Sequence, residues 1–244
     1  MSRCSMRYKI DSDIVIRSEN AAKPARQASL YLSAIITDLD HVSCSFDYGC
    51  GKLRYQNAIL QSTDTLVLVD SEVQLSRKQM VCGKHATIRE AVQRSNRISA
   101  YNTTEFARLP QTFDRGFCIN VLSIIPFLSV RRHVLHLIRE KLRAGGTCLF
   151  VVQYRNSDFT RMRRMRNARP WRDGFLIDSL RGFSFYGLIS PERLSAMLLS
   201  AGFEIVDRHL HEGSAFFLAR SPTRRSPPTI MEISEEDNFR VSYR

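Results

Sequence analysis

Two glycines and two carboxylates carry the clearest chemical signal in the sequence. The segment Asp47-Tyr48-Gly49-Cys50-Gly51 follows a short apolar run, and Asp70 ends a second apolar run nineteen residues after Gly51. Glycines between a strand and a helix let the backbone approach a ligand closely, because they lack Cβ and adopt positive φ. A carboxylate at the end of the next strand can accept hydrogen bonds from both ribose hydroxyls. This combination predicts a pocket for an adenosine-type cofactor.

Arginine and aromatic residues crowd together in residues 155–187. Guanidinium groups bind phosphate or carboxylate in forked pairs, and aromatic rings stack on bases or other planar molecules. Because ligands of open α/β sheets bind outside the carboxyl ends of the strands, we expect this segment, which follows a strand, to overhang the site. The alternative is an exposed lid whose arginines pair with Asp158, Asp173 and Asp178. The residues expected to contact a second ligand are Arg155, Arg161, Arg163, Arg164, Arg166 and Trp171.

Apolar runs that alternate with helical patterns predict the elements that position these residues. Parallel neighbours in a sheet need a crossover helix, so the alternation predicts a doubly wound, mostly parallel sheet. The expected strands are 8–17, 42–48, 65–70, 98–101, 113–122 and 147–154, with a closing antiparallel pair at 203–210 and 215–219. The expected helices are 24–38, 53–61, 71–97, 131–142 with a C-cap glycine from Ala144-Gly145-Gly146, and 191–201 with Ser190 as N-cap.

The composition favours one globular unit with a basic surface. The 36 Lys and Arg against 24 Asp and Glu give a formal charge of +12. That excess favours an anionic partner, such as nucleic acid, a phosphorylated metabolite or a membrane surface; the alternative is a basic surface that only keeps the protein in solution. The expected organisation is an extension at 1–23, a domain at 24–220 with a lid or insertion at 155–187, and a disordered tail at 221–244.

The cysteines and the chain start predict the compartment. The six cysteines form no C-x-x-C pair, so neither a zinc site nor a disulfide framework is expected, and no metal is predicted. We read neither an export signal nor a membrane span in the sequence. A cytoplasmic location is therefore expected.

Five segments in the same order resemble the class I S-adenosylmethionine-dependent methyltransferases. FDYGCGK is similar to the glycine motif of that family, VLVD to the acidic end of its second strand, and FDRGFCINVLSIIP to its fourth-strand motif. IREKLRAGG resembles the helix and glycine turn before the fifth strand, and ISPERLSAMLLSAGFEIVD the last helix and sixth strand. The resemblance spans residues 25–220. It implies a Rossmann-like sheet of seven strands with an antiparallel last strand, and S-adenosylmethionine as the cofactor.

The resemblance also implies roles for individual residues. The turn would shape the pocket for the methionine part of the cofactor, Asp70 would hold the ribose, and Asn102 would take the place of an acid that binds the adenine amine. Asn120 would lie beside the transferable methyl group. Leu53 departs from the pattern, because many members have a third glycine there. The cofactor-binding residues expected in this way are Asp47, Gly49, Cys50, Gly51, Asp70, Asn102 and Asn120.

The resulting hypothesis is a methyltransferase with an anionic acceptor, such as nucleic acid or a phosphorylated or carboxylated molecule. Methyl transfer from a sulfonium depends mainly on positioning and desolvation, so no catalytic base is predicted. One alternative is a small-molecule methylase with a closed pocket under Trp171 and Phe183. The other is a cofactor-binding module without catalytic activity. Cys118 and Cys148 lie inside expected strands and are interpreted as core residues.

Overall fold

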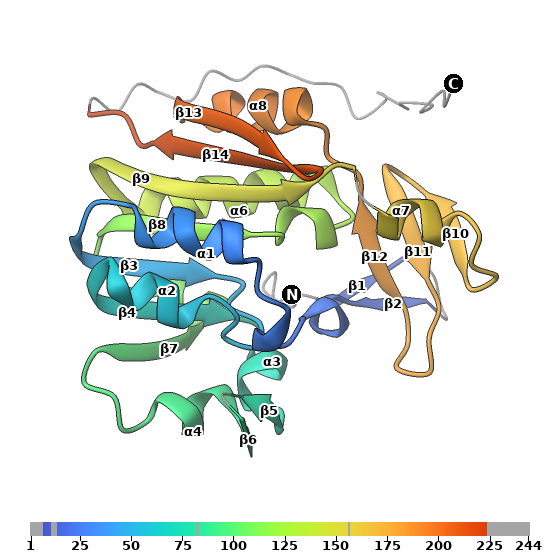
Figure 1. The fold of residues 1–244 in the computed structure, drawn as a ribbon, viewed down its shortest axis with the longest axis horizontal. Coiled ribbons are helices and arrows are strands. Elements are labelled where there is room, and N and C mark those ends of the chain that lie inside the picture. Colours follow the sequence, from blue (N-terminus) through green and yellow to red (C-terminus); the bar gives the residue numbers. More distant parts are fainter. Residues whose placement is uncertain (1–6, 11–13, 82, 156, 224–244) are drawn as a thin grey trace.

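A seven-stranded sheet forms the centre of the molecule (Figure 1). The computed structural model describes residues 7–10, 14–81, 83–155 and 157–223. The strand order is β13-β14-β9-β8-β3-β4-β7. Strands β3, β4, β7, β8 and β9 are parallel, whereas β14 is antiparallel to both β9 and β13, which confirms the predicted Rossmann-like architecture. The strand bounds are β3 (Val42–Tyr48), β4 (Thr63–Asp70), β7 (Ile98–Asn102), β8 (Phe113–Ile119), β9 (Leu142–Gln153), β13 (Glu204–His211) and β14 (Ser214–Arg220).

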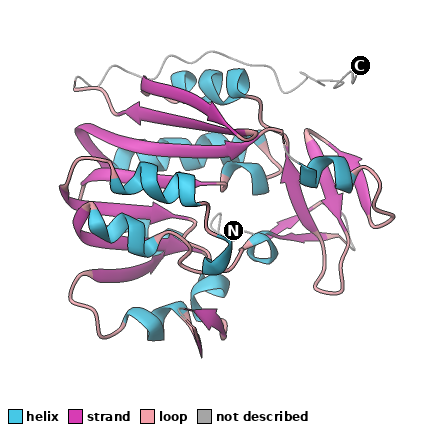
Figure 2. Cartoon of the chain, in the orientation of Figure 1, coloured by secondary structure: helices cyan, strands magenta, loops and turns pink. Residues whose placement is uncertain are grey.

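Helices cover both faces of this sheet, as Figure 2 shows. One buried cluster joins the sheet to α1 (Leu30–Thr37), α2 (Gln56–Gln61) and α4 (Ile88–Val92). The other joins it to α5 (Thr103–Arg108), α6 (Leu128–Lys141) and α8 (Pro191–Ser200). Successive residues of β4 alternate between the clusters, since side chains of a strand point to opposite faces. The apolar runs in the sequence therefore reflect burial on both sides.

The segment predicted as one helix at 71–97 is not a single helix. It forms α3 (Glu72–Ser76), an antiparallel hairpin of β5 (Gln79–Val81) and β6 (Lys84–Ala86), and then α4. Gly83 takes a φ of +79° in the hairpin turn. Ser71 and Thr87 each cap the helix that follows them with a side-chain oxygen. Two separate N-caps and a turn glycine thus divide a stretch whose composition alone resembled a helix.

Several predicted helix ends also differ from those in the structure. The 24–38 helix is a short 3-10 turn, η2 (Ala25–Gln27), followed by α1, for which Ser29 is the N-cap. Helix α6 begins at Leu128 and ends at Lys141, and Gly145 does not cap it but lies within β9 with a φ of +76°. Helix α8 begins at Pro191 after an N-cap at Ser190, as predicted. Local capping signals were therefore reliable for α8, where the N-cap serine, the N1 proline and the apolar stripe agree.

The N-terminal extension is part of the fold. Where one strand was predicted, β1 (Arg7–Lys9) and β2 (Val15–Arg17) pair antiparallel, and the 3-10 turn η1 (Ser18–Ala21) follows. Ile16 is fully buried and forms a parallel bridge with Phe183. The extension therefore packs on the insertion at 155–187, and the two bridged residues are 167 positions apart in the chain.

The insertion at 155–187 forms a subdomain beyond the carboxyl ends of the parallel strands, at the right of Figure 1. It contains α7 (Ser157–Met162) and an antiparallel sheet of β10 (Ala168–Trp171), β11 (Gly174–Ile177) and β12 (Ser184–Gly187). Phe159, Met162 and Phe175 form a small apolar cluster inside it. Its sheet explains why the strand–helix alternation breaks here.

The expected tail is described only at its start. The Ser221 amide donates to the Gly146 carbonyl at 2.8 Å, and the Gly145 amide donates to the Ser221 carbonyl at 2.9 Å. The remainder of the predicted disordered tail, 224–244, lies outside the described residues. Within the described ranges, no helix is both long and apolar enough to cross a membrane.

Candidate functional site

A cleft opens at the carboxyl ends of β3, β4 and β8, where the sequence places the glycine turn and its acids. It has about 680 Å³ of empty space that is continuous with solvent. Four segments line it: residues 18–23 of the extension, the turn 47–55, Asp70 with Gln74, and residues 119–124 after β8. Six of the seven predicted cofactor-binding residues are among them: Asp47, Gly49, Cys50, Gly51, Asp70 and Asn120.

The glycine turn is tied to the neighbouring strand. The amides of Gly49 and Cys50 both donate to the Val69 carbonyl, at 2.7 and 3.1 Å. Gly49 has a φ of +82°, and a Cβ on it would lie 2.3 Å from Val121 Cγ2. Gly51 has a φ of +57°, but a Cβ there would meet only ordinary contacts. The close approach that excludes a side chain is therefore at Gly49.

Leu53 preserves the backbone geometry of the glycine that it replaces. Its φ is +60°, in the left-handed region, and its side chain is buried. Burial against the cluster around α1 and α2 offsets the cost of this conformation for a residue with a Cβ. The departure from the family pattern therefore leaves the turn intact, while α2 begins three residues later, at Gln56.

Asp70 joins the turn to the end of β4. One carboxylate oxygen accepts from the Gly51 amide at 2.9 Å, and the other accepts from the Ser71 amide at 2.7 Å. Burial raises the pKa of Asp70 to about 6, although these hydrogen bonds favour the charged form. Each carboxylate oxygen has a second lone pair, so Asp70 can accept two further hydrogen bonds from a ligand.

Asp47 is the second buried acid of the cleft. Burial and, to a smaller extent, the charge of Asp70 together raise its pKa to about 7, although Arg54 acts in the opposite direction. Because the charged form is disfavoured without a partner, a cationic ligand group would bind here and favour ionisation. The cleft can therefore hold a ligand that carries positive charge.

Asn120 has an unsatisfied polar atom at the end of β8. Its backbone takes a φ of +60°, and its amide donates to the Val151 carbonyl at 2.8 Å. This turn ends β8 at Ile119, earlier than predicted. The side-chain Oδ1 is buried and has no hydrogen-bond partner in the described structure. Such atoms in folded proteins usually have a partner, so Oδ1 is a candidate acceptor for a ligand donor.

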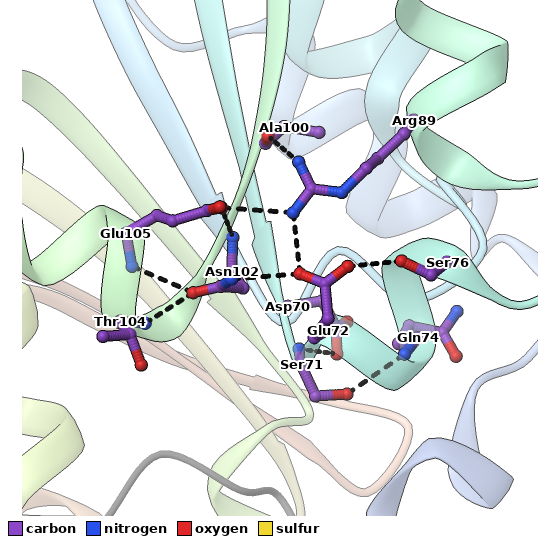
Figure 3. A network of polar contacts seen from close by, with 10 residues as sticks. All are labelled: Asp70, Ser71, Glu72, Gln74, Ser76, Arg89, Ala100, Asn102, Thr104 and Glu105. Atoms are coloured by element: carbon purple, nitrogen blue, oxygen red, sulfur yellow. Dashed lines mark hydrogen bonds and ion pairs between the residues drawn. The ribbon is translucent and has the colours of Figure 1, made fainter. Parts of the chain in front are cut away.

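Asn102 does not line the cleft. It caps α5, because its Oδ1 accepts from the Thr104 and Glu105 amides at 3.0 and 2.9 Å, and its Nδ2 donates to Glu72 at 3.0 Å. Figure 3 shows the surrounding network, in which Arg89 joins Glu72 at 2.7 Å and Glu105 at 3.2 Å. The hydrogen bonds that Glu72 accepts, first of all the one from Arg89, lower its pKa to about 2. The structure thus gives Asn102 a structural role at the edge of the site.

Sequence reasoning missed two parts of the cleft. Residues 18–23 of the extension form one wall, and Glu19 in this wall is buried. Gln74 forms another part, and its Nε2 donates to the Gly51 carbonyl. No local signal identifies residues 18–23, since their position depends on the pairing of β2 with the distant insertion. Gln74 could have been suspected, because it follows Asp70 within the first turn of a helix capped by Ser71.

The predicted acceptor-side residues do not line the cleft. Arg161 lies in the last turn of α7, and Arg163, Arg164 and Arg166 follow the helix. All four side chains are exposed. Arg155 is exposed too, and its amide donates to the Gly213 carbonyl at 3.0 Å. The alternative of a lid whose arginines pair with Asp173 is wrong for this acid, because Asp173 pairs with Arg131 and Arg193 of the main domain. The side chain of Asp158 lies outside the described residues.

Trp171 is a packing residue at the base of the insertion. Its ring lies 6.3 Å from that of Phe127 and 5.7 Å from that of Phe185, both edge-on. The Arg172 guanidinium lies 4.9 Å from the Trp171 ring and 4.7 Å from the Phe127 ring. Trp171 and Phe183 are half-buried against the main core. The structure fits the small-molecule alternative only in this respect, that both rings lie near this edge of the sheet.

The described cysteines and acids form no metal centre. Among residues of the described ranges, no three His, Cys, Asp or Glu side chains lie close enough to hold an ion. Cys118 and Cys148 are buried in the sheet, where burial holds their thiol pKa values above the ordinary range. Cys50 is also buried, and its pKa is raised by burial and by Asp70. These thiols therefore pack as small apolar groups.

Comparison with known proteins gives one relative and many structural neighbours. No protein-family model matches the chain. YmfD of Escherichia coli K12, an uncharacterized protein, is 31% identical over 204 residues, which cover 82% of this chain and 90% of YmfD. This identity and coverage establish that the two chains are members of one family.

The structural neighbours include methyltransferases. The 1,6-didemethyltoxoflavin-N1-methyltransferase of Burkholderia thailandensis, solved with 1,6-didemethyltoxoflavin and S-adenosylhomocysteine, has a TM-score of 0.54 and 18% identity, covering 88% of this chain and 99% of its own. The N-methyltransferase NodS of Bradyrhizobium japonicum, solved with S-adenosylhomocysteine, has a TM-score of 0.51 and 14% identity, covering 79% and 86%. At these identities the likeness shows the fold.

Proposed function

We propose that this chain, which belongs to the same family as Escherichia coli YmfD and has the class I S-adenosylmethionine-dependent methyltransferase fold, binds S-adenosylmethionine in the cleft and transfers its methyl group to an acceptor. The observation that carries this proposal is Asp70. A buried carboxylate at the end of β4 holds the glycine turn after β3 through the Gly51 amide, and both line one cleft. The two structural neighbours described above were solved with S-adenosylhomocysteine, the product of methyl donation.

The cleft residues fit the polar groups of this cofactor. Asp70 would accept from the ribose hydroxyls through its remaining lone pairs. Asp47 would face the positive charge of the methionine part, and Asn120 Oδ1 would accept a hydrogen bond from its ammonium group. Gly49 would keep Val121 in its place in the cleft wall, because a Cβ on residue 49 would clash with the Val121 side chain. Asn102 would reach the adenine amine only if its capping contacts with α5 rearranged.

The chain's contribution to the reaction would be orientation and exclusion of water. When bound, S-adenosylmethionine supplies an electrophilic methyl group on a sulfonium. Residues 119–124 and the strap of residues 18–23 would enclose this group. The buried acids, when ionised, would attract the positively charged cofactor in a cleft that excludes water. We assign no catalytic base.

The exposed arginines of the insertion support an anionic acceptor. The insertion lies on the side of the molecule to which the parallel strands point, and its exposed arginines include Arg155, Arg161, Arg163, Arg164 and Arg166. The whole chain carries a formal charge of +12. A small-molecule acceptor under Trp171 and Phe183 is the second candidate, favoured by the half-buried position of both rings. A cofactor-binding module without catalytic activity is the third, and turnover of labelled cofactor excludes it.

The arginines should affect acceptor binding and not cofactor binding. Replacing Arg163, Arg164 and Arg166 together by Gln should leave S-adenosylhomocysteine affinity unchanged, since none of them lines the cleft. If the acceptor is nucleic acid, the slope of log K against log salt should become shallower by about two to three. The matched control is a triple variant that loses the same charge elsewhere on the surface, by replacing the exposed Lys78, Lys84 and Arg94 by Gln. Equal slopes for all three proteins, measured with RNA and DNA oligonucleotides, would refute a nucleic-acid clamp.

Asp70 should be required for cofactor binding. Asp70→Ala should weaken S-adenosylhomocysteine binding by about 1.5–3 kcal/mol, the scale for losing hydrogen bonds to a charged group. Asp64→Ala is the matched control, because Asp64 lies exposed at the opposite end of the same strand. Calorimetric titration measures both. Unchanged affinity in a folded Asp70→Ala variant would rule out the ribose assignment.

The proposed activity is tested with methyl-labelled S-adenosylmethionine and fractionated cell extract. Label is followed into RNA, DNA, protein and small molecules, with boiled protein as the blank. Transfer into one fraction identifies the acceptor class. Binding of cofactor without label transfer to any fraction would favour the module without catalytic activity.

A further inference from the structure

Glu19 is a buried acid that the resemblance does not assign. It lies in η1, its side chain is 4% exposed, and it lines the cleft. Oε1 accepts from Arg7 Nε at 3.0 Å and Arg7 Nη2 at 2.9 Å, and its carbonyl accepts from Arg77 Nη2 at 2.8 Å. Oε2 is buried and has no hydrogen-bond partner among the described residues. A buried carboxylate oxygen without a donor is costly, so this atom indicates a missing partner.

The strap that carries Glu19 lies on the Asp70 side of the cleft. Ala22 Cβ is 3.6 Å from the place that a Cβ on Gly51 would take, and the Gly51 amide donates to Asp70. Arg77, which holds the Glu19 carbonyl, is close enough to both acids that each raises its pKa, although burial lowers it more. Glu19 and Asp70 therefore lie at the same part of the cleft, on two segments that are far apart in the sequence.

We propose that Glu19 is a second ribose-binding carboxylate, whose Oε2 accepts a hydrogen bond from a ligand hydroxyl while residues 18–23 close over the cofactor. This inference rests on the proposed function. Both oxygens of Asp70 already accept a backbone amide, whereas Oε2 of Glu19 has its full capacity available. A vicinal diol has two hydroxyl donors, so two acids that lie at the same part of the cleft match it. Because Oε2 is shielded from solvent, the strap must shift for the ligand to enter.

The test combines a variant with a ligand analogue. In Glu19→Gln, the remaining amide oxygen still accepts from Arg7, so the fold should be preserved. Wild type and variant are titrated with S-adenosylhomocysteine and with its 2′,3′-dideoxy analogue. Glu19→Gln should weaken binding of the first about tenfold, on the scale of one charge-assisted hydrogen bond, and should leave binding of the analogue unchanged. Glu204→Gln, an exposed change on β13, is the matched control.

The outcomes separate this inference from the proposed function. If wild type binds S-adenosylhomocysteine and Glu19→Gln binds it equally well, the role of Glu19 is wrong and the cofactor assignment stands. If the substitution lowers the affinity for both ligands by the same factor, Glu19 does not contact the ribose hydroxyls. If wild type binds neither ligand, the proposed function itself fails. If the variant does not fold, hydrogen exchange of the wild-type protein provides the test. The amides of residues 14–23 should gain protection when S-adenosylhomocysteine binds. Unchanged exchange there would refute the closure of the strap over the cofactor.

Discussion

Replacing Asp173 by Asn should lower the free energy of unfolding by about 3–5 kcal/mol, because it leaves a buried guanidinium without its counter-charge. Arg131, on α6, is 1% exposed and pairs with both oxygens of Asp173. Its Nε donates to the Leu122 and Ile125 carbonyls at 3.0 and 2.8 Å, so it cannot turn toward solvent without losing these bonds. Arg193, on α8, also contacts Asp173 at 2.8 Å. Asp173 therefore fastens the insertion to the main domain.

Urea unfolding monitored by circular dichroism measures this effect. Asp178→Asn is the matched control, because Asp178 is exposed in the same subdomain, and its substitution should change stability by no more than about 0.5 kcal/mol. Equal stability of both variants would show that the ion pair does not anchor the insertion. Below its unfolding transition, Asp173→Asn should still bind S-adenosylhomocysteine normally, since no residue of the insertion lines the cleft.

Cofactor affinity should rise by up to about 1000-fold between pH 5 and pH 8, because ligand binding favours the ionised forms of two acids that burial keeps partly protonated. The pKa values are about 7 for Asp47 and about 6 for Asp70 in the free protein. A cationic group near Asp47 and ribose donors at Asp70 lower both values, so binding releases protons below pH 7. Titrations at pH 5, 6.5 and 8 measure the slope, and Asp47→Asn should flatten its upper part. Constant affinity across this range would show that neither acid contacts the ligand.

The same acids predict the opposite trend for the stability of the free protein. Their folded pKa values lie above the unfolded value of 3.8, so their contribution to stability is complete below pH 4 and is lost as the pH rises through about 7. Bound cofactor would remove this loss of stability, because it favours the ionised forms of both acids. Ligand-induced stabilisation should therefore be larger at pH 8 than at pH 5.

The elements that carry strong local signals were predictable. The β3 strand, its glycine turn and Asp70 follow from apolar runs, backbone requirements of glycine and a strand-end acid. Helix α8 follows from Ser190, Pro191 and its apolar stripe. Each of these features depends on residues within about twenty positions of one another, where sequence spacing and spatial distance agree.

Features that depend on tertiary contacts were not predictable. Glu19 enters the cleft only because β2 bridges Phe183, and Arg131 is buried only because Asp173 reaches it from the insertion. On an amphipathic helix, an arginine normally indicates the solvent face. Asn102 matched a position in a family pattern, whereas its contacts are those of a helix cap. The same side chain suits both roles, and the capping contacts with α5 become visible only in the structure.

Direct titration of the purified chain with S-adenosylhomocysteine and with NAD tests the central claim most directly. Both ligands contain adenosine, but only the first has the amino acid that Asp47 and Asn120 are expected to bind. We predict one binding site for S-adenosylhomocysteine and no measurable binding of NAD. Binding of NAD in preference to S-adenosylhomocysteine, or binding of neither, would contradict the assignment of this cleft to S-adenosylmethionine.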